Sequence, residues 1–254
     1  MGPTTISFDQ ELIWHPSPNF NARRGVAGPS LIVLHYTAMD SAGAALERLC
    51  DPEHEVSAHY LIAQCGMLYQ MVRDGDRAWH AGAGSWGGQG DVNSRSIGIE
   101  LCNPGTGAFP AAQIAVLTAL LGHLRARWNI PAQGVIGHSD LAPDRKSDPG
   151  PWFPWAELAA AGHSVDAQPS GDDTGGDFWE HAYRFGYGRE FGKDAVLRAY
   201  QMRFRPGHLG KPVGPDDYRL MAAPSTGYRS ASAAISLQSS GPTGLPKCPG
   251  RNRI

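Results

Sequence analysis

The segment Ser30-Leu-Ile-Val-Leu-His-Tyr36 decides the fold, because four consecutive aliphatic residues lead into a histidine. A short run that is apolar at every position, rather than at alternate ones, is typical of a strand whose two faces are both buried. Such strands lie in sheets that helices cover on both sides. The sequence therefore predicts an α/β protein with this strand inside its sheet and His35 near the end of the strand.

Further strands and helices are predicted after this segment. Residues 96–101 alternate in polarity, which favours a strand with three large apolar residues on one face and Gly98 and Glu100 on the other. Apolar residues at helical spacing between Pro110 and Pro131 predict the clearest helix. The other predicted elements are a helix at residues 41–49, a hairpin of residues 59–63 and 68–72, a short strand at 135–136 and a helix at 155–161.

Length and composition indicate one large domain with a small companion. The 254 residues are 41% hydrophobic and 18% charged, which is enough apolar material for a sizeable core. Residues 163–176 are small, polar and punctuated by Gly and Pro, as in a linker, and three short helical stretches follow. We expect a central mixed β-sheet flanked by helices and then a small three-helix domain. The expected boundaries are an irregular arm at 1–28, the main domain at 29–162, the linker at 163–176, the helical domain at 177–223 and a disordered tail at 224–254.

Charge, hydropathy and cysteine usage exclude several classes of protein. The 22 basic and 24 acidic residues give a formal net charge of −2, which argues against binding nucleic acid through counterion release. No apolar run approaches the roughly 18–20 residues of a transmembrane segment. The cysteines form no CxxC pair and therefore no thiolate zinc site. The first twenty residues lack the features of a secretory signal, so we expect a cytoplasmic protein as the sequence stands, or a periplasmic or envelope protein if a signal or anchor has been removed.

Polar residues lie at or near the ends of three predicted strands, where open sheets place their ligands. His35 follows the first apolar run, Glu100 lies in the strand at 96–101, and His138 follows the short strand at 135–136. Asp148 comes ten residues after His138. Two neutral imidazoles and one carboxylate are a frequent catalytic zinc set that leaves a fourth position open. The spacing alone is weak support, because a histidine at a strand end is more often a hydrogen-bonded structural residue.

Six short motifs follow one another along the sequence and include the residues named above. The motifs are Leu34-His-Tyr-Thr37, Val56-Ser-Ala-His-Tyr60, Ala78-Trp-His-Ala-Gly82, Ser96-Ile-Gly-Ile-Glu-Leu101, Gly137-His-Ser-Asp-Leu-Ala-Pro143 and Arg145-Lys-Ser-Asp-Pro-Gly150. With these motifs and Phe153-Pro-Trp155, the sequence between residues 14 and 162 resembles the type 2 N-acetylmuramoyl-L-alanine amidase family, which is related in fold to the peptidoglycan recognition proteins.

The resemblance implies roles for individual residues. It implies that His35, His138 and Asp148 bind Zn²⁺, that Glu100 handles the proton of the attacking water, and that Lys146 lies beside the reacting carbonyl. A carboxylate at that place can exchange protons with the water and the leaving amine, and an ammonium group stabilises an oxyanion. The residues expected to contact the substrate are Tyr36, Trp79, His80, Trp86 and Asn103.

Structural alternatives exist for several of these residues. Lys146 can be a solvated loop cation, and Glu100 can be paired with an arginine such as Arg95 or Arg145. His59 is expected to be structural. Trp79 and Trp86 can be core residues instead of stacking on sugar or peptide.

The expected reaction is the zinc-dependent hydrolysis of the amide between the lactyl group of N-acetylmuramic acid and L-alanine in peptidoglycan or muropeptides, by a monomer. One alternative is a non-catalytic peptidoglycan-recognition module, and another is a zinc peptidase that acts within the stem peptide. Cell-wall recycling, an envelope role and a phage-type lysin are all compatible with the sequence.

The C-terminal stretch has a second, weaker resemblance. Residues 195–207 and 215–218 are similar to the three-helix peptidoglycan-binding domain of some amidases, and Tyr200-Gln201 fits its pattern. Lys211-Pro-Val-Gly214 departs from that pattern. The alternative for this part is a helical bundle that only packs on the catalytic domain.

Overall fold

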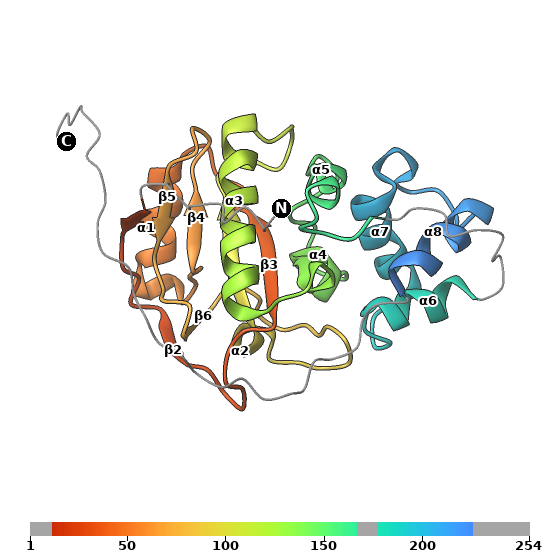
Figure 1. Ribbon diagram of the computed structural model, residues 1–254, viewed down its shortest axis with the longest axis horizontal. Helices are drawn as coiled ribbons and strands as arrows, with labels where there is room; N and C mark the ends of the chain where they lie inside the picture. The colour runs from red at the N-terminus through yellow and green to blue at the C-terminus, as the bar shows by residue number, and fades with distance from the viewer. Residues whose placement is uncertain (1–11, 167–176, 226–254) are drawn as a thin grey trace, which may run out of the picture.

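A six-stranded mixed sheet with the strand order β1-β5-β4-β7-β3-β8 forms the centre of the computed structural model, which describes residues 12–166 and 177–225 (Figure 1). A second, two-stranded sheet pairs β2 with β6. The strands are β1 (Leu12–Trp14), β2 (Phe20–Ala22), β3 (Leu31–Tyr36), β4 (Tyr60–Ile62), β5 (Leu68–Gln70), β6 (Asp76–Ala78), β7 (Ser96–Leu101) and β8 (Val135–Gly137).

Strand β3 lies between two parallel neighbours, as its apolar run predicts. It pairs with β7 on one side and with β8 on the other, and its first five residues are buried. The register places His35 directly opposite Glu100 and Leu34 opposite Gly137. Because parallel strands end at the same edge of a sheet, the polar residues at the carboxyl ends of β3, β7 and β8 come together there.

Helix α3 (Ala111–Trp128) covers one face of the sheet (Figure 1). Pro110 occupies its N-cap, and Asn129 ends it in the left-handed conformation with φ 53°. Its leucines pack on the apolar face of β7, so both the predicted helix and the predicted alternation of β7 are confirmed. The residues of this cluster from the two elements are Ile97, Ile99, Leu101, Ile114, Val116, Leu117, Leu120, Leu121 and Leu124.

The opposite face of the sheet is covered in two places. Helix α1 (Ala42–Cys50) packs on Leu61 of β4, and Ser41 caps its first turn. Three helices from the C-terminal part pack beside β3 and β8. The remaining helices are α2 (Val92–Arg95), α4 (His138–Leu141), α5 (Trp155–Ala160), α6 (Phe178–Phe185), α7 (Lys193–Phe204) and α8 (Pro215–Ser225), with short 3₁₀ turns at Pro52–His54, Ala132–Gly134 and Pro206–His208.

The described part of the N-terminal segment is not an irregular arm, so that expectation is wrong. Strand β1 pairs in parallel with β5, and β2 pairs with β6. The Arg23 side chain, on the stretch that follows β2, donates hydrogen bonds to the backbone carbonyls of Asp74, Ser94 and Ser96. Strands of three residues are too short to show a periodicity in the sequence, and their backbone partners fix them instead.

The C-terminal helices agree with the three predicted helical stretches, and they pack on the main domain. Phe178, Phe185 and Tyr187 are buried in one cluster with Leu31, Val33 and Trp86. The rings of Phe185 and Tyr187 meet Trp86 edge-on at centroid distances of 5.2 and 5.4 Å. The C-terminal helices therefore pack on the main domain and complete the hydrophobic core on one side of the sheet. Most of the expected linker (167–176) and most of the expected tail (226–254) lie outside the described residues.

A buried ion pair joins the C-terminal helices to the segment that carries His138. Arg203 of α7 donates to Oδ2 of Asp140 and, at 3.0 Å, to the carbonyl of Val135. Asp140 also accepts the backbone N–H of Gly137 at 2.8 Å and the hydroxyl of Tyr187 at 2.8 Å. Every side chain in this network is buried, so its hydrogen bonds compensate the cost of desolvating the two charges.

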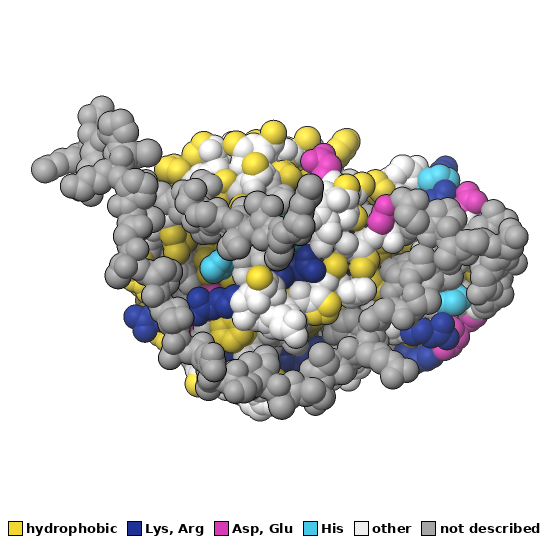
Figure 2. All heavy atoms as spheres, in the orientation of Figure 1, with side chains coloured by type: hydrophobic (Ala, Val, Ile, Leu, Met, Phe, Trp, Pro, Cys, Tyr) yellow, Lys and Arg dark blue, Asp and Glu magenta, His cyan; other side chains and the backbone are white. Residues whose placement is uncertain are grey.

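The visible surface agrees with the near-neutral composition. Figure 2 shows acidic and basic side chains close to one another at the end of the molecule that carries the C-terminal helices. Among the described residues, no helix is long and apolar enough to cross a bilayer.

Replacing Arg203 with Ala is expected to destabilise the protein by about 3–5 kcal/mol, because it leaves Asp140 charged, buried and without its cation. Urea denaturation followed by circular dichroism measures this change. The control is Arg189→Ala, which removes an exposed ion pair with Glu180 from the same helical part and should change stability little. Equal effects of the two substitutions would contradict the role given to the buried network.

Candidate metal centre and active-site pocket

Three side chains converge at the carboxyl edge of the sheet. His35 lies near the end of β3, His138 begins α4 directly after β8, and Asp148 lies on the loop that follows. The backbone carbonyl of Asp148 accepts the N–H of Ser139 at 2.9 Å, which holds this loop against α4. The three residues are 1%, 4% and 8% exposed.

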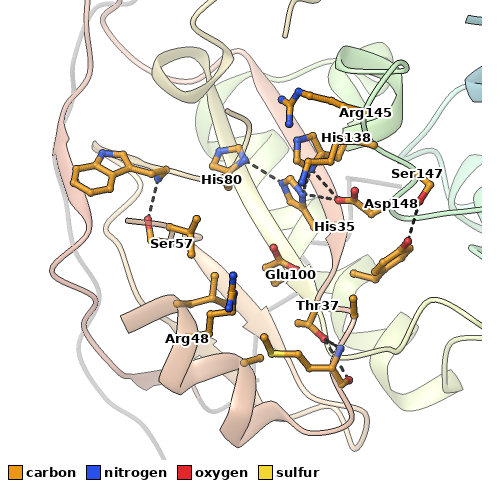
Figure 3. Close-up of a pocket in the computed structure, with 18 residues that line it drawn as sticks. His35, Thr37, Arg48, Ser57, His80, Glu100, His138, Arg145, Ser147 and Asp148 are labelled. Atoms are coloured by element: carbon orange, nitrogen blue, oxygen red, sulfur yellow. Dashed lines mark hydrogen bonds and ion pairs between the residues drawn. The ribbon is translucent and has the colours of Figure 1, made fainter. Parts of the chain in front are cut away.

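One atom from each residue meets the other two at close range (Figure 3). Nδ1 of His35 lies 3.0 Å from Nδ1 of His138 and 2.9 Å from Oδ2 of Asp148. Nδ1 of His138 lies 3.0 Å from the same carboxylate oxygen. Among the described residues, these three form the group whose potential metal-binding atoms all lie within 4.8 Å of one another.

The hydrogen bonds behind the two imidazoles assign their tautomers. Ser96 donates its hydroxyl hydrogen to the carbonyl of Val92, so it accepts from Nε2 of His80 at 3.1 Å. Nδ1 of His80 is then the acceptor for Nε2–H of His35 at 3.1 Å. Nδ1 of neutral His35 therefore carries a lone pair rather than a proton.

The same reasoning applies to His138. Its Nε2 lies 3.0 Å from the backbone carbonyl of Ala81, which only accepts hydrogen bonds. Nε2 therefore carries the proton, and the lone pair of Nδ1 faces His35 and Asp148. Three acceptor atoms thus face one another with no donor between them.

Such a set of acceptors fits a metal cation. Ligands at 2.0–2.2 Å in a tetrahedral site are separated by about 3.3 Å, close to the distances here. Burial lowers the pKa of His35 to about 4, with a further contribution from the neighbouring His138, so this imidazole is neutral at pH 7. Burial also lowers the pKa of His80, which keeps the chain of hydrogen bonds neutral. Neutral imidazole is the form that binds metals.

The cluster forms one side of a pocket of about 360 Å³ (Figure 3). Arg145 and Ser147 from the Asp148 loop lie at the same end, and α1 with the segment at Ser57 forms the other end. The lining residues are His35, Tyr36, Thr37, Ala38, Met39, Ala45, Arg48, Leu49, Val56, Ser57, Trp79, His80, Glu100, His138, Arg145, Lys146, Ser147 and Asp148.

Glu100 lies on β7 beside His35, and its carboxyl group faces this pocket. Its Oε2 atom is buried and has no hydrogen-bond partner among the described residues. Arg95 and Arg145, which the sequence offered as partners, donate to backbone carbonyls instead. Burial raises the pKa of Glu100 to about 8, and the charge of Asp148 adds to this, whereas Lys146 acts in the opposite direction. A carboxyl group with these properties can hold a proton near neutral pH.

A family model described as N-acetylmuramoyl-L-alanine amidase matches residues 25–151. The chain belongs to this family. The match includes β3, β7, β8 and the loop with Asp148, so the whole cluster lies within it.

Individual relatives agree with this assignment. N-acetylmuramoyl-L-alanine amidase AmiD of Escherichia coli is 36% identical over 69% of this chain and 75% of its own length. The 1,6-anhydro-N-acetylmuramyl-L-alanine amidase AmpD of Citrobacter freundii is 37% identical over 57% of this chain and 87% of its own length. The structure of E. coli AmiD with anhydro-N-acetylmuramic acid-L-Ala-D-gamma-Glu-L-Lys superposes with a TM-score of 0.69 at 31% identity, covering 80% of this chain and 91% of that one.

Most of the other predicted site residues line the pocket of this amidase. Tyr36, Trp79, His80 and Lys146 all do so, and the Tyr36 hydroxyl lies 3.0 Å from Oγ of Ser147 on the Asp148 loop. His59 is structural, as expected, because its Nδ1 accepts the backbone N–H of Gly98.

Two of the expected substrate contacts are corrected by the structure. Trp86 is fully buried against Phe185 and Tyr187, where the C-terminal helices cover it. Asn103 is 2% exposed, and its side chain accepts the N–H of Gly105 and donates to the carbonyl of Ala108. Neither residue lines the pocket, so both serve the fold.

The sequence did not reveal the residues that position His80 against the metal-ligand cluster. A Cβ atom at Gly98 would lie 2.4 Å from the ring of His80, so the glycine makes room for this ring and the space on its face is filled rather than open. Ser96 had no signal in the sequence, although it fixes the orientation of His80. The alternation of β7 placed Gly98 on the correct face but carried no information about its neighbour.

Replacing His80 with Phe is expected to weaken metal binding by about 10–100-fold, because His35 loses the acceptor that orients its ring. Competition with a chelator on the purified protein measures the affinity. His80→Gln keeps an acceptor and should recover part of the loss, while His54→Gln, which changes an exposed histidine, should have no effect. An unchanged affinity in His80→Phe would remove His80 from the metal centre.

Proposed function

We propose that this chain hydrolyses the amide bond between the lactyl group of N-acetylmuramic acid and L-alanine, and that His35, His138 and Asp148 hold a Zn²⁺ ion for this reaction. The observation that carries the proposal is the buried set of three acceptor atoms at about 3.0 Å, open to a pocket on the fold of this amidase family. Two imidazoles and one carboxylate suit zinc and leave a position for a reacting group.

The residues around the cluster supply the rest of the chemistry. When bound, Zn²⁺ would act as a Lewis acid that polarises the amide carbonyl and acidifies water. Glu100 in its ionised form takes a proton from the attacking water through its unpartnered Oε2. Its raised pKa suits it to hold that proton and then return it to the leaving amine of L-alanine. Lys146 supplies a positive charge for the oxyanion that forms on the carbonyl.

Tyr36 and His80 support these groups. The contact between the Tyr36 hydroxyl and Ser147 holds the loop between Lys146 and Asp148 against β3. His80 orients the ligand His35 from behind and therefore acts through it. Trp79, which borders the pocket at the end formed by α1, contacts the substrate.

Two forms of substrate contain this amide bond, namely small soluble muropeptides and the polymeric cell wall. The names of the Citrobacter freundii relative and of the molecule bound to E. coli AmiD both specify an anhydromuramic group. We infer that soluble anhydromuropeptides are substrates of this chain. Digestion of such muropeptides against intact sacculi tests this choice, and with it the assignment to recycling or to the cell envelope. Binding of peptidoglycan by residues 177–223 stays a prediction.

The catalytic assignment predicts different results for ligands and for Glu100. His35→Ala should lose zinc and activity together, because three protein ligands leave no spare. Glu100→Gln should retain zinc and lower kcat by about 10²–10⁴-fold, as expected for a lost general acid–base. Metal analysis and muropeptide hydrolysis resolved by liquid chromatography measure both properties, with Glu157→Gln on the exposed side of α5 as the control.

Four outcomes would contradict the proposal. Full turnover by His35→Ala would exclude the metal assignment, and an unchanged rate in Glu100→Gln would move the proton transfer to another group. A zinc-loaded protein that binds muropeptides without cleaving them would be a recognition module. Release of free amino acids with an intact lactyl–alanine bond would identify a peptidase.

A further inference from the structure

Arg48 is a cation in the pocket that the proposed reaction does not use. It lies on α1 and lines the pocket across from Arg145 and the metal-ligand cluster, as Figure 3 shows. Its side chain is exposed, and no hydrogen bond or ion pair joins it to any other residue in the described ranges. By contrast, the guanidinium of Arg145 is engaged by the backbone carbonyls of Ala81 and Ala83. Arg48 is therefore available to a ligand.

The helix that carries Arg48 is firmly held. Leu46 and Leu49 are buried against Leu61 and Met71, and the hydroxyl of Ser17 donates to the carbonyl of Leu49 at 2.6 Å. A charged group on a fixed helix binds a ligand with less loss of conformational freedom than one on a mobile loop.

The surroundings of Arg48 favour a ligand that is part apolar and part anionic. Met39, Leu49 and Val56 supply apolar surface at this end of the pocket. A guanidinium group binds carboxylates through two parallel hydrogen bonds, so a carboxylate fits this end better than a neutral sugar does.

The chemistry of a muropeptide places its negative charge on one side of the scissile bond. The lactyl carboxyl of the muramic acid is consumed in the amide, so the sugar side is neutral. In the ligand of E. coli AmiD the glutamate is linked through its γ-carboxyl, which leaves its α-carboxylate free. That carboxylate follows the scissile nitrogen by about two residues, or roughly 7 Å of extended chain, which a pocket of this size accommodates.

We propose that Arg48 binds the free α-carboxylate of a γ-linked glutamate and selects substrates that carry it. This inference rests on the proposed function, and it assigns the α1 end of the pocket to the leaving peptide and the opposite end to the sugar. Binding energy from this remote contact holds the amide in place at the metal centre.

The test compares two substrates that differ in one group, muramoyl-L-Ala-D-γ-Glu-L-Lys with a free α-carboxylate on the glutamate and the same molecule with an α-carboxamide at that position. The zinc-loaded protein should hydrolyse the carboxylate with a kcat/KM about 10–100-fold higher, mainly through KM. Arg48→Met should abolish this preference by lowering kcat/KM for the carboxylate alone. Arg198→Met, which changes an exposed arginine on α7 outside the pocket, should leave the preference intact.

The outcomes separate this inference from the function on which it rests. An equal kcat/KM for the two substrates with the unmodified protein would overturn the role of Arg48 and leave the amidase reaction in place. An equal loss of kcat/KM for both substrates in Arg48→Met would do the same. Failure of the zinc-loaded protein to cleave either substrate would overturn the proposed function and this inference with it.

Discussion

Three unprotonated acceptor atoms within about 3.0 Å of one another are the constraint on which the rest of this structure depends. Without a cation such atoms repel one another, so each must be held from outside the cluster. His35 is held by His80, His138 by the carbonyl of Ala81, and the loop of Asp148 by its backbone bond to Ser139. The parallel register of β3 with β7 and β8 brings these elements to one edge of the sheet.

The packing around the sheet supports the same site from a distance. Asp140 follows His138 by two residues and is bound by Arg203 and Tyr187, both from the C-terminal part of the chain. The C-terminal helices are therefore integral to the fold around α4, rather than a detachable module. Because the match to the Citrobacter freundii relative covers 57% of this chain, the core of the family does not require every element present here.

The sequence predicted the elements whose hydrophobic pattern is long or continuous. The apolar run of β3, the alternation of β7 and the helical spacing of α3 each report directly on burial, and all three are confirmed. The candidate ligand residues followed from strand ends and from the family resemblance. Strands β1, β2 and β6 are too short for such a pattern, and their partners are distant in the sequence.

The errors about individual side chains have a similar physical origin. Tryptophan is a residue type that often stacks on sugars, so the sequence suggested this role for Trp86. In the structure the C-terminal helices pack against Trp86 and bury it. Asn103 is polar beside a strand end, yet its hydrogen bonds are spent on its own loop. The sequence places Gly98 on one face of β7 but does not reveal that the ring of His80 fills the space beside it. Contacts between distant segments decide each of these cases.

The central claim is that two imidazole Nδ1 atoms and one carboxylate oxygen hold a zinc ion at the end of β3. Anomalous diffraction at the zinc edge from crystals of the zinc-loaded protein measures this directly. The account predicts one ion at about 2.0–2.2 Å from Nδ1 of His35, Nδ1 of His138 and an oxygen of Asp148, with no fourth protein ligand. An ion bound through Nε2 of either histidine, or completed by His80, would contradict it.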